Sequence, residues 1–205
     1  ALAKVLAMPQ PYTNGDHWRM NTDLTGRLLI ALPGIGDSRF SRSVILLCAH
    51  SPDFAMGIVL NKPMDGIRLP ELFDQLDVET ELGVPDTRVL DGGPVSTERG
   101  FVIHTDDVIS EGATLEIDGT LCMTATRDML LMIGSSAAPR KSVLALGYSG
   151  WGAGQLEEEL AANAWLVGDP DDDIVFGDDY DLKWRHALGR MGVDSGRLQV
   201  DGGSA

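Results

Sequence analysis

Positive charge is scarce in this sequence of 205 residues. Sixteen lysines and arginines stand against 31 aspartates and glutamates, which gives a formal net charge of −15 at pH 7. A surface this acidic repels nucleic-acid phosphates and anionic lipid headgroups unless its basic residues are clustered. Arg140 and Lys141 form the only adjacent basic pair. We therefore expect neither direct nucleic-acid binding nor binding to a membrane.

Long apolar runs and cysteines are also few. A helix that spans a bilayer needs about 20 apolar residues, whereas the longest strictly apolar stretches here are short, such as 44–49 and 129–133. The start, 1–8, is too brief for the apolar core of a signal peptide. Cys48 and Cys122 each lie inside an apolar run, which is typical of buried thiols in a reducing compartment. We expect a cytoplasmic protein with two free, reduced cysteines.

The pattern along the chain predicts an α+β protein. Residues 1–22 show no sustained period, which predicts a flexible N-terminal arm, and 23–205 is interpreted as a single domain. A turn is expected at 61–63, because Pro63 cannot donate a ladder hydrogen bond. Strands are expected at 26–32, 43–49, 55–60, 89–90, 100–104 and 142–147, with a hairpin at 114–123. Helices are expected at 69–76, 126–135, 155–165 and 181–191, the last capped by Asp181.

The glycine-rich segment 147–155 resembles two catalytic or binding motifs without completing either. A nucleophile elbow around Ser149 needs glycine at position 151, where this chain has tryptophan. A dinucleotide loop needs a third glycine, and the glutamates of the following helix would repel a pyrophosphate. We interpret the segment as a tight strand-to-helix turn in which Gly152 and Gly154 supply positive φ or close backbone approach.

Other motif-like stretches predict no metal or phosphate site. The segment 134–142 ends in Lys-Ser like a P-loop but lacks the glycine before the basic residue. The acidic stretch 169–181 has Ile174 and Tyr180 where an EF-hand needs glycine and glutamate, so a solvated acidic loop is expected. The histidines form no zinc-binding pattern. The sequence predicts no metal site, no cofactor and no catalytic residue.

Several segments of the chain stand in a distinctive order and spacing: LTGRLLIALP (24–33), DSRFSRSV (37–44), MGIVLNKP (56–63), DGGPV and ERGF (91–101) and GYSGWGAGQLE (147–157). Together they resemble the AlgH/YqgE family of bacterial proteins, and the likeness runs from about Leu24 to Trp184. The resemblance implies a cytosolic protein with a mixed, bifurcated β-sheet, a small barrel-like part and helices packed around it. The family's usual label, transcriptional regulator, comes from a genetic association with alginate control, and the family carries no agreed catalytic residues.

The favoured function is that of a non-enzymatic regulatory or adaptor protein, acting through protein or small-ligand contacts without direct DNA binding. The alternative is a ligand-binding protein or enzyme with a pocket at the Gly/Pro-rich loops, where sites concentrate on a rigid scaffold. Asp37, Arg39, Asn61 and Asp91 lie beside those loops and are the candidate ligand- or partner-binding residues. Two simpler interpretations stay open: Asp37 and Arg39 form a local ion pair or cap, and Asn61 closes its turn.

Overall fold

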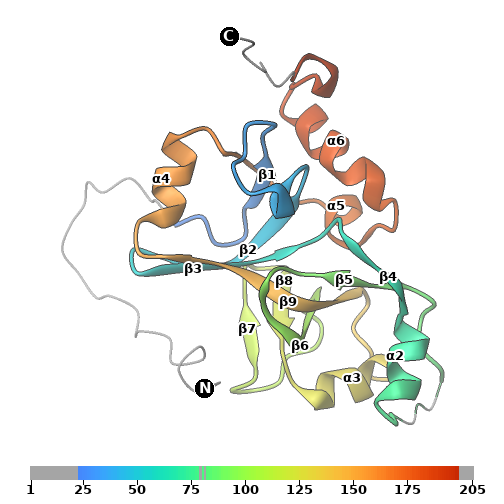
Figure 1. Ribbon diagram of the computed structural model, residues 1–205. Coiled ribbons are helices and arrows are strands. Elements are labelled where there is room, and N and C mark those ends of the chain that lie inside the picture. Colours follow the sequence, from blue (N-terminus) through green and yellow to red (C-terminus); the bar gives the residue numbers. More distant parts are fainter. Residues whose placement is uncertain (1–22, 79, 81, 199–205) are drawn as a thin grey trace.

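Strands form the centre of the protein. In the computed structural model, which describes residues 23–78, 80 and 82–198, the flexible arm predicted over 1–22 lies outside the described residues. The strands are β1 (Leu28–Ala31), β2 (Val44–Ser51), β3 (Phe54–Val59), β4 (Pro63–Arg68), β5 (Arg88–Asp91), β6 (Val95–Thr105), β7 (Thr114–Glu116), β8 (Leu121–Thr124), β9 (Ser142–Gly152) and β10 (Trp165–Gly168). They join into one sheet with the order β10-β1-β2-β3-β9-β6-β8-β7, from which β5 and β4 branch (Figure 1).

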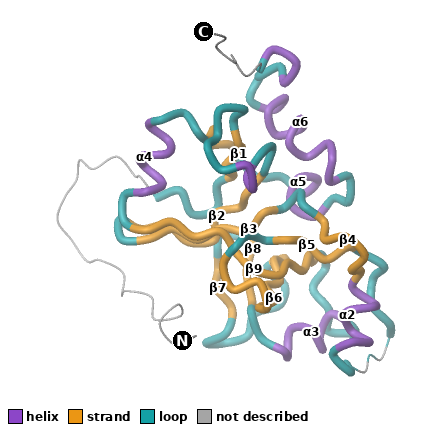
Figure 2. The backbone as a smooth tube through the Cα atoms, in the orientation of Figure 1, coloured by secondary structure: helices purple, strands orange, loops and turns teal. Residues whose placement is uncertain are grey.

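Helices lie around the strands (Figure 2). The α-helices are α2 (Leu69–Gln75), α3 (Arg127–Ile133), α4 (Gln155–Ala161), α5 (Asp172–Phe176) and α6 (Tyr180–Arg190), and the 3₁₀ helices are η1 (Ser38–Phe40) and η2 (Ser195–Arg197). Among the described residues, no helix has the length and apolar character that crossing a membrane requires.

The sheet divides at β9. Near its end, β9 pairs antiparallel with β3, where Gly57 faces Ser149. Closer to its start, β9 pairs parallel with β5, where Leu90 faces Ala145. The same strand also pairs antiparallel with β6 along most of its length. This mixed, bifurcated sheet curls into a partial barrel with helices around it, and the predicted α+β class is confirmed.

Each group of helices covers its own apolar cluster. Buried residues of α5 and α6, such as Ile174 and Leu188, pack with the faces of β1, β2 and β3 in the largest cluster. Leu156 of α4 packs against the other face of the same strands. α2 and α3 contribute Phe73 and Met129 to a third cluster, at the end of the sheet away from α4 (Figure 1). The helices therefore pack on the faces of the sheet, each group over its own apolar cluster.

Most predicted elements are confirmed in kind, but their boundaries differ. The turn predicted at 61–63 gives way at Pro63 to β4, which pairs irregularly with β5. The strand-to-helix turn predicted over 147–155 starts later than predicted, because β9 continues through Gly152 and only the residues between Gly152 and α4 form the turn. The helix predicted over 155–165 ends at Ala161, since Asn163 adopts a φ of 57° and Trp165 begins β10.

The acidic stretch predicted as a loop over 169–181 contains a helix. The side chain of Asp171 accepts a hydrogen bond from the Ile174 backbone N–H and caps α5, in which Ile174 and Val175 are buried. The cap predicted for the last helix is also wrong, since Asp179 holds the N-cap position and Asp181 lies in the first turn. Acidic residues suit these positions because a helix N-terminus carries partial positive charge.

Candidate functional site

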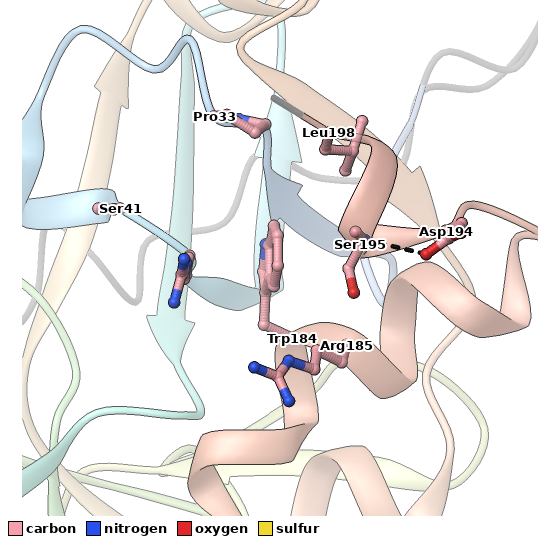
Figure 3. A pocket seen from close by; sticks show the side chains of 9 residues that line it. Pro33, Ser41, Trp184, Arg185, Asp194, Ser195 and Leu198 are labelled. Atoms are coloured by element: carbon pink, nitrogen blue, oxygen red, sulfur yellow. Dashed lines mark hydrogen bonds between the residues drawn. The ribbon is translucent and has the colours of Figure 1, made fainter. Parts of the chain in front are cut away.

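A cavity of about 590 Å³ opens between the loop after β1, helix α6 and the C-terminal helix η2 (Figure 3). We call it the cationic pocket, because arginines outnumber acids among its lining residues. The lining residues are Pro33, Ser41, Arg42, Trp184, Arg185, Asp194, Ser195, Gly196 and Leu198. Its walls come from two parts of the chain, 33–42 and 184–198, that are far apart in the sequence.

Arg42 holds a strained position at the edge of this pocket. Its backbone φ of 53° is uncommon for a residue with a side chain and is typical of functional sites. Its guanidinium carbon lies 5.6 Å from the ring centroid of Trp184, which is within range of a cation–π interaction. The Trp184 ring is itself fixed, because its Nε1–H donates to the Ala31 carbonyl at 2.8 Å. The guanidinium therefore has a rigid platform.

Asn61 holds the backbone of Arg42 in this conformation. Its Oδ1 accepts a hydrogen bond from the Val44 N–H at 2.8 Å, and its Nδ2 donates to the Arg42 carbonyl at 2.8 Å. The side chain thus bridges from the β3–β4 connection to the residues on both sides of Ser43. Asn61 positions the loop of Arg42 and does more than close its own turn.

Asp37 and Arg39 are bound to each other. The Asp37 side chain caps η1 by accepting from the Arg39 N–H at 3.0 Å, and the Arg39 guanidinium lies 2.6 Å from Asp37 Oδ2. The hydrogen bond from Arg39 lowers the pKa of the Asp37 carboxyl below its usual range. Both side chains are solvent-exposed, so the pair forms the local cap and ion pair considered in the sequence analysis.

Lys62 connects these candidates to Asp91. Its Nζ donates to the Arg39 carbonyl, and its own carbonyl accepts from the Asp91 N–H at 2.8 Å. Burial lowers the pKa of Lys62, while Asp91 and Asp37 act in the opposite direction. Sequence reasoning missed Lys62, although it stands between Asn61 and Pro63 in a family segment. Hydrogen bonds of Lys62 and its neighbour Asn61 therefore connect the segments that carry the four candidates, but none of the four lines the cationic pocket.

Arg42 and Arg185 are two further charged residues that sequence reasoning did not identify. Among the described residues neither guanidinium has a carboxylate ion-pair partner, whereas Arg39 and Arg190 do. Asp194 also lines the pocket, and its Oδ1 accepts from the Gly196 N–H at 2.9 Å. The pocket thus offers two cationic groups to a ligand, in a protein whose acids greatly outnumber its bases.

The GWGAGQLE segment has a structural role. Glu159, two residues beyond it, accepts hydrogen bonds on Oε2 from the indole N–H groups of Trp151 at 2.9 Å and Trp165 at 2.7 Å. Gln155 donates to the other oxygen of Glu159 at 2.9 Å and accepts from the Gly152 N–H at 3.1 Å. One carboxylate therefore joins β9, α4 and β10.

The DGGPV segment meets β9 through glycine backbones. A Cβ on Gly93 would lie 2.3 Å from the Tyr148 carbonyl carbon, and a Cβ on Gly147 would lie 2.4 Å from the Gly93 oxygen. Only glycine permits this approach. Gly154 has the expected positive φ of 71°, but the expectation for Gly152 is wrong, because a Cβ there meets open space.

The remaining candidate groups are held within the fold. Ser149 is fully buried in β9, where its Oγ donates to the Gly92 carbonyl at 3.4 Å. Cys48 and Cys122 are free and buried, as predicted, and burial raises the pKa of the Cys48 thiol to about 12. No group of three or more histidine, cysteine or acidic side chains in the described part of the chain is arranged to hold a metal ion.

Fold and site together define an acidic α+β protein in which a bifurcated sheet supports a cationic pocket. The AlgH-like family model matches residues 28–196, and the chain belongs to this family.

Relatives and solved structures agree with this assignment. The chain is 48% identical over 183 residues to a UPF0301 protein of Caulobacter vibrioides, covering 89% of this chain and 94% of the relative. It is 50% identical over 191 residues to a UPF0301 protein of Afipia carboxidovorans, covering 90% and 91%. The solution structure of the AlgH protein from Pseudomonas aeruginosa is 37% identical and superposes with a TM-score of 0.72, covering 91% of this chain and 98% of that one.

Proposed function

We propose that the protein is a non-enzymatic regulatory protein of the cytoplasm that responds to a small anionic ligand in the cationic pocket and does not bind DNA directly. The observation that carries this proposal is the pair of arginines, Arg42 and Arg185, that line one cavity without a carboxylate partner among the described residues. The free, buried cysteines suit a reducing compartment.

The chemistry of the pocket favours an anion. Guanidinium groups match carboxylate and phosphate oxygens with paired hydrogen bonds and stay charged at every physiological pH. A volume of about 590 Å³ falls in the range of small-molecule sites. Ser41 and Ser195 add hydroxyl groups to the lining. Asn61 holds Arg42 before a ligand arrives, which reduces the entropy that binding must overcome.

Regulation through a ligand is more consistent with this chain than regulation through DNA contact. A formal charge of −15 opposes approach to a phosphate backbone. A small anion meets a different environment, because it contacts only the pocket, where the lining holds two arginines and one aspartate. The label of transcriptional regulator that the family carries is then compatible with an indirect action.

The indole N–H of Trp184 provides a direct test, because Trp184 lines the pocket and its indole N–H gives a separate signal in ¹H–¹⁵N NMR spectra. We expect inorganic phosphate, pyrophosphate or citrate to shift this signal saturably. Arg42→Ala and Arg185→Ala should each weaken binding about 10-fold or more, as expected when a charged hydrogen bond is lost.

Two further variants complete the test. Arg27→Ala is the matched control, since Arg27 pairs with Asp169 at 2.6 Å and does not line the pocket, and it should bind like the wild type. Asn61→Ala should weaken binding although Asn61 touches no ligand. Absence of a saturable shift with all three anions, or equal shifts in every variant, would contradict the proposal.

A further inference from the structure

A second cavity lies at the other end of the sheet, where α2 and α3 lie side by side (Figure 1). We call this cavity of about 310 Å³ the α2–α3 groove. Gly100 and Val102 of β6 form part of its floor, and the residues after α2 and at the start of α3 form its walls. The remaining lining residues are Leu76, Val78, Glu98, Arg99, Thr124, Ala125, Thr126, Arg127, Leu130 and Leu144.

The lining of the groove is largely apolar. Leu76 is 45% exposed at its edge, and Val78, Leu130 and Leu144 also line it. Below them the floor continues into the buried cluster under α2 and α3. Exposed apolar groups grouped around a depression are typical of a binding surface, whereas isolated ones are not.

The charge of the groove differs from that of the molecule. Arg99 and Arg127 line it, and Glu98 is the only acid among the described residues of its lining. The Arg99 guanidinium carbon lies 5.2 Å from the Phe101 ring centroid, and no described carboxylate forms an ion pair with either arginine. The groove therefore combines an apolar floor with a basic rim on a strongly acidic protein.

We propose that the α2–α3 groove binds a segment of a partner protein in which apolar anchor residues stand beside aspartate or glutamate. The anchors would fill the floor, and the carboxylates would pair with Arg99 and Arg127. An acidic segment is repelled by most of this surface and attracted at this rim, which gives the contact its specificity. A second copy of this chain is disfavoured because two molecules of charge −15 repel each other. This groove is separate from the cationic pocket, so the inference does not depend on the proposed ligand.

Gly100 allows the groove to be filled without disturbing the backbone. A Cβ added there would lie 3.5 Å from Leu144 Cδ1 and 3.8 Å from Leu146 Cδ2, which are ordinary contacts with side chains. Gly100→Leu should therefore occupy the floor of the groove. Arg99→Glu combined with Arg127→Glu reverses the rim instead, and these positions need no backbone change.

The test is a selection of random linear peptides displayed on phage against the full chain. We expect the enriched peptides to contain apolar residues flanked by Asp or Glu. Their affinity should fall about 10-fold or more in Gly100→Leu and in the Arg99→Glu/Arg127→Glu double variant, as for loss of anchor contacts. Arg27→Glu, a charge reversal at an arginine that lines neither cavity, is the matched control and should leave peptide binding unchanged.

Several outcomes would overturn the proposal. These are no enrichment, enriched peptides without acidic residues, or peptides that bind the folded double variant as tightly as the wild type. Concentration-dependent dimerisation in sedimentation experiments that Gly100→Leu abolishes would assign the groove to a second copy of the chain. If Gly100→Leu fails to fold, the double variant alone decides between these results.

Discussion

Lys183 is a buried charged residue with few polar neighbours. Its side chain is 3% exposed, and its Nζ donates to the carbonyls of Leu60 at 3.0 Å and Val175 at 3.4 Å. The same Nζ lies 5.0 Å from the ring centroid of Tyr180. Burial lowers the pKa of Lys183 to about 8, while the charge of Asp178 acts to raise it. This lysine therefore links α6 to the end of β3 at an energetic cost near neutral pH.

The low pKa predicts a particular dependence of stability on pH. The unfolded chain keeps this proton up to its ordinary pKa of 10.5, whereas the folded protein loses it near 8. Between these values the unfolded state binds more protons, so the free energy of unfolding should rise with pH, by up to about 3 kcal/mol from this residue. Urea unfolding from neutral to alkaline pH measures it.

Lys183→Met supplies the comparison. The variant should lack the alkaline rise in the free energy of unfolding. The free energy of unfolding of the wild type minus that of the variant should therefore increase from about pH 8 toward 10.5. Cys48, with its pKa raised to about 12, acts in the opposite direction but is present in both proteins and cancels. Parallel profiles would show that Lys183 does not titrate in this range.

At the same scale, the candidate site was only partly predictable from sequence. Asn61 stands out because it precedes Lys-Pro after an apolar strand, and a polar residue there has a clear local role. Arg42 and Arg185 give no such signal. They lie far apart in the sequence, and the residues around each are polar residues of the kind found on any exposed segment. Their proximity depends on how α6 packs against β1 and β2, which is a property of the tertiary structure.

Glu159 connects three elements through one carboxylate. The indole N–H groups of Trp151 and Trp165 both donate to it. The two rings pack edge to face, with their centroids 6.1 Å apart. Removing the acceptor would leave two indole N–H groups unsatisfied in a largely buried setting. Glu159→Ala should therefore lower the free energy of unfolding by about 2–3 kcal/mol. Chemical denaturation followed by tryptophan fluorescence measures this loss.

Glu158→Ala is the matched control, because Glu158 is exposed on the same helix. It should change stability by no more than about 0.5 kcal/mol, as surface substitutions usually do. If the two variants unfolded alike, the tryptophan contacts of Glu159 would not contribute to stability.

Sequence patterns predicted elements well where the stabilising contacts are local or the strand is continuously apolar, as in β2. They failed where distant contacts decide. β4 is half-exposed, and it is a strand because it pairs with β5. β10 is likewise a strand because it pairs with β1. The length of β9 likewise depends on β3, which pairs with Trp151 and Gly152 beyond the apolar run.

The net charge of −15 governs how the whole molecule meets other macromolecules. We predict no specific complex with duplex DNA at a physiological ionic strength of about 0.15 M, because binding releases counterions only where basic groups replace them. Fluorescence anisotropy titrations at several salt concentrations measure this. Sub-micromolar affinity with a steep salt dependence would contradict the prediction and would require a basic face that gathers most of the sixteen basic residues.

The position of β9 has a consequence for how the chain is made. β3, β5 and β6 all leave the ribosome before the strand that they share as a neighbour. Until residues 142–152 emerge, a nascent chain carries unsatisfied strand edges on two sheet halves at once, and such edges invite intermolecular pairing. A pause while residues 142–152 are still inside the ribosome would therefore leave an aggregation-prone fragment, whereas a pause after Gly152 has emerged would allow both halves to pair with β9.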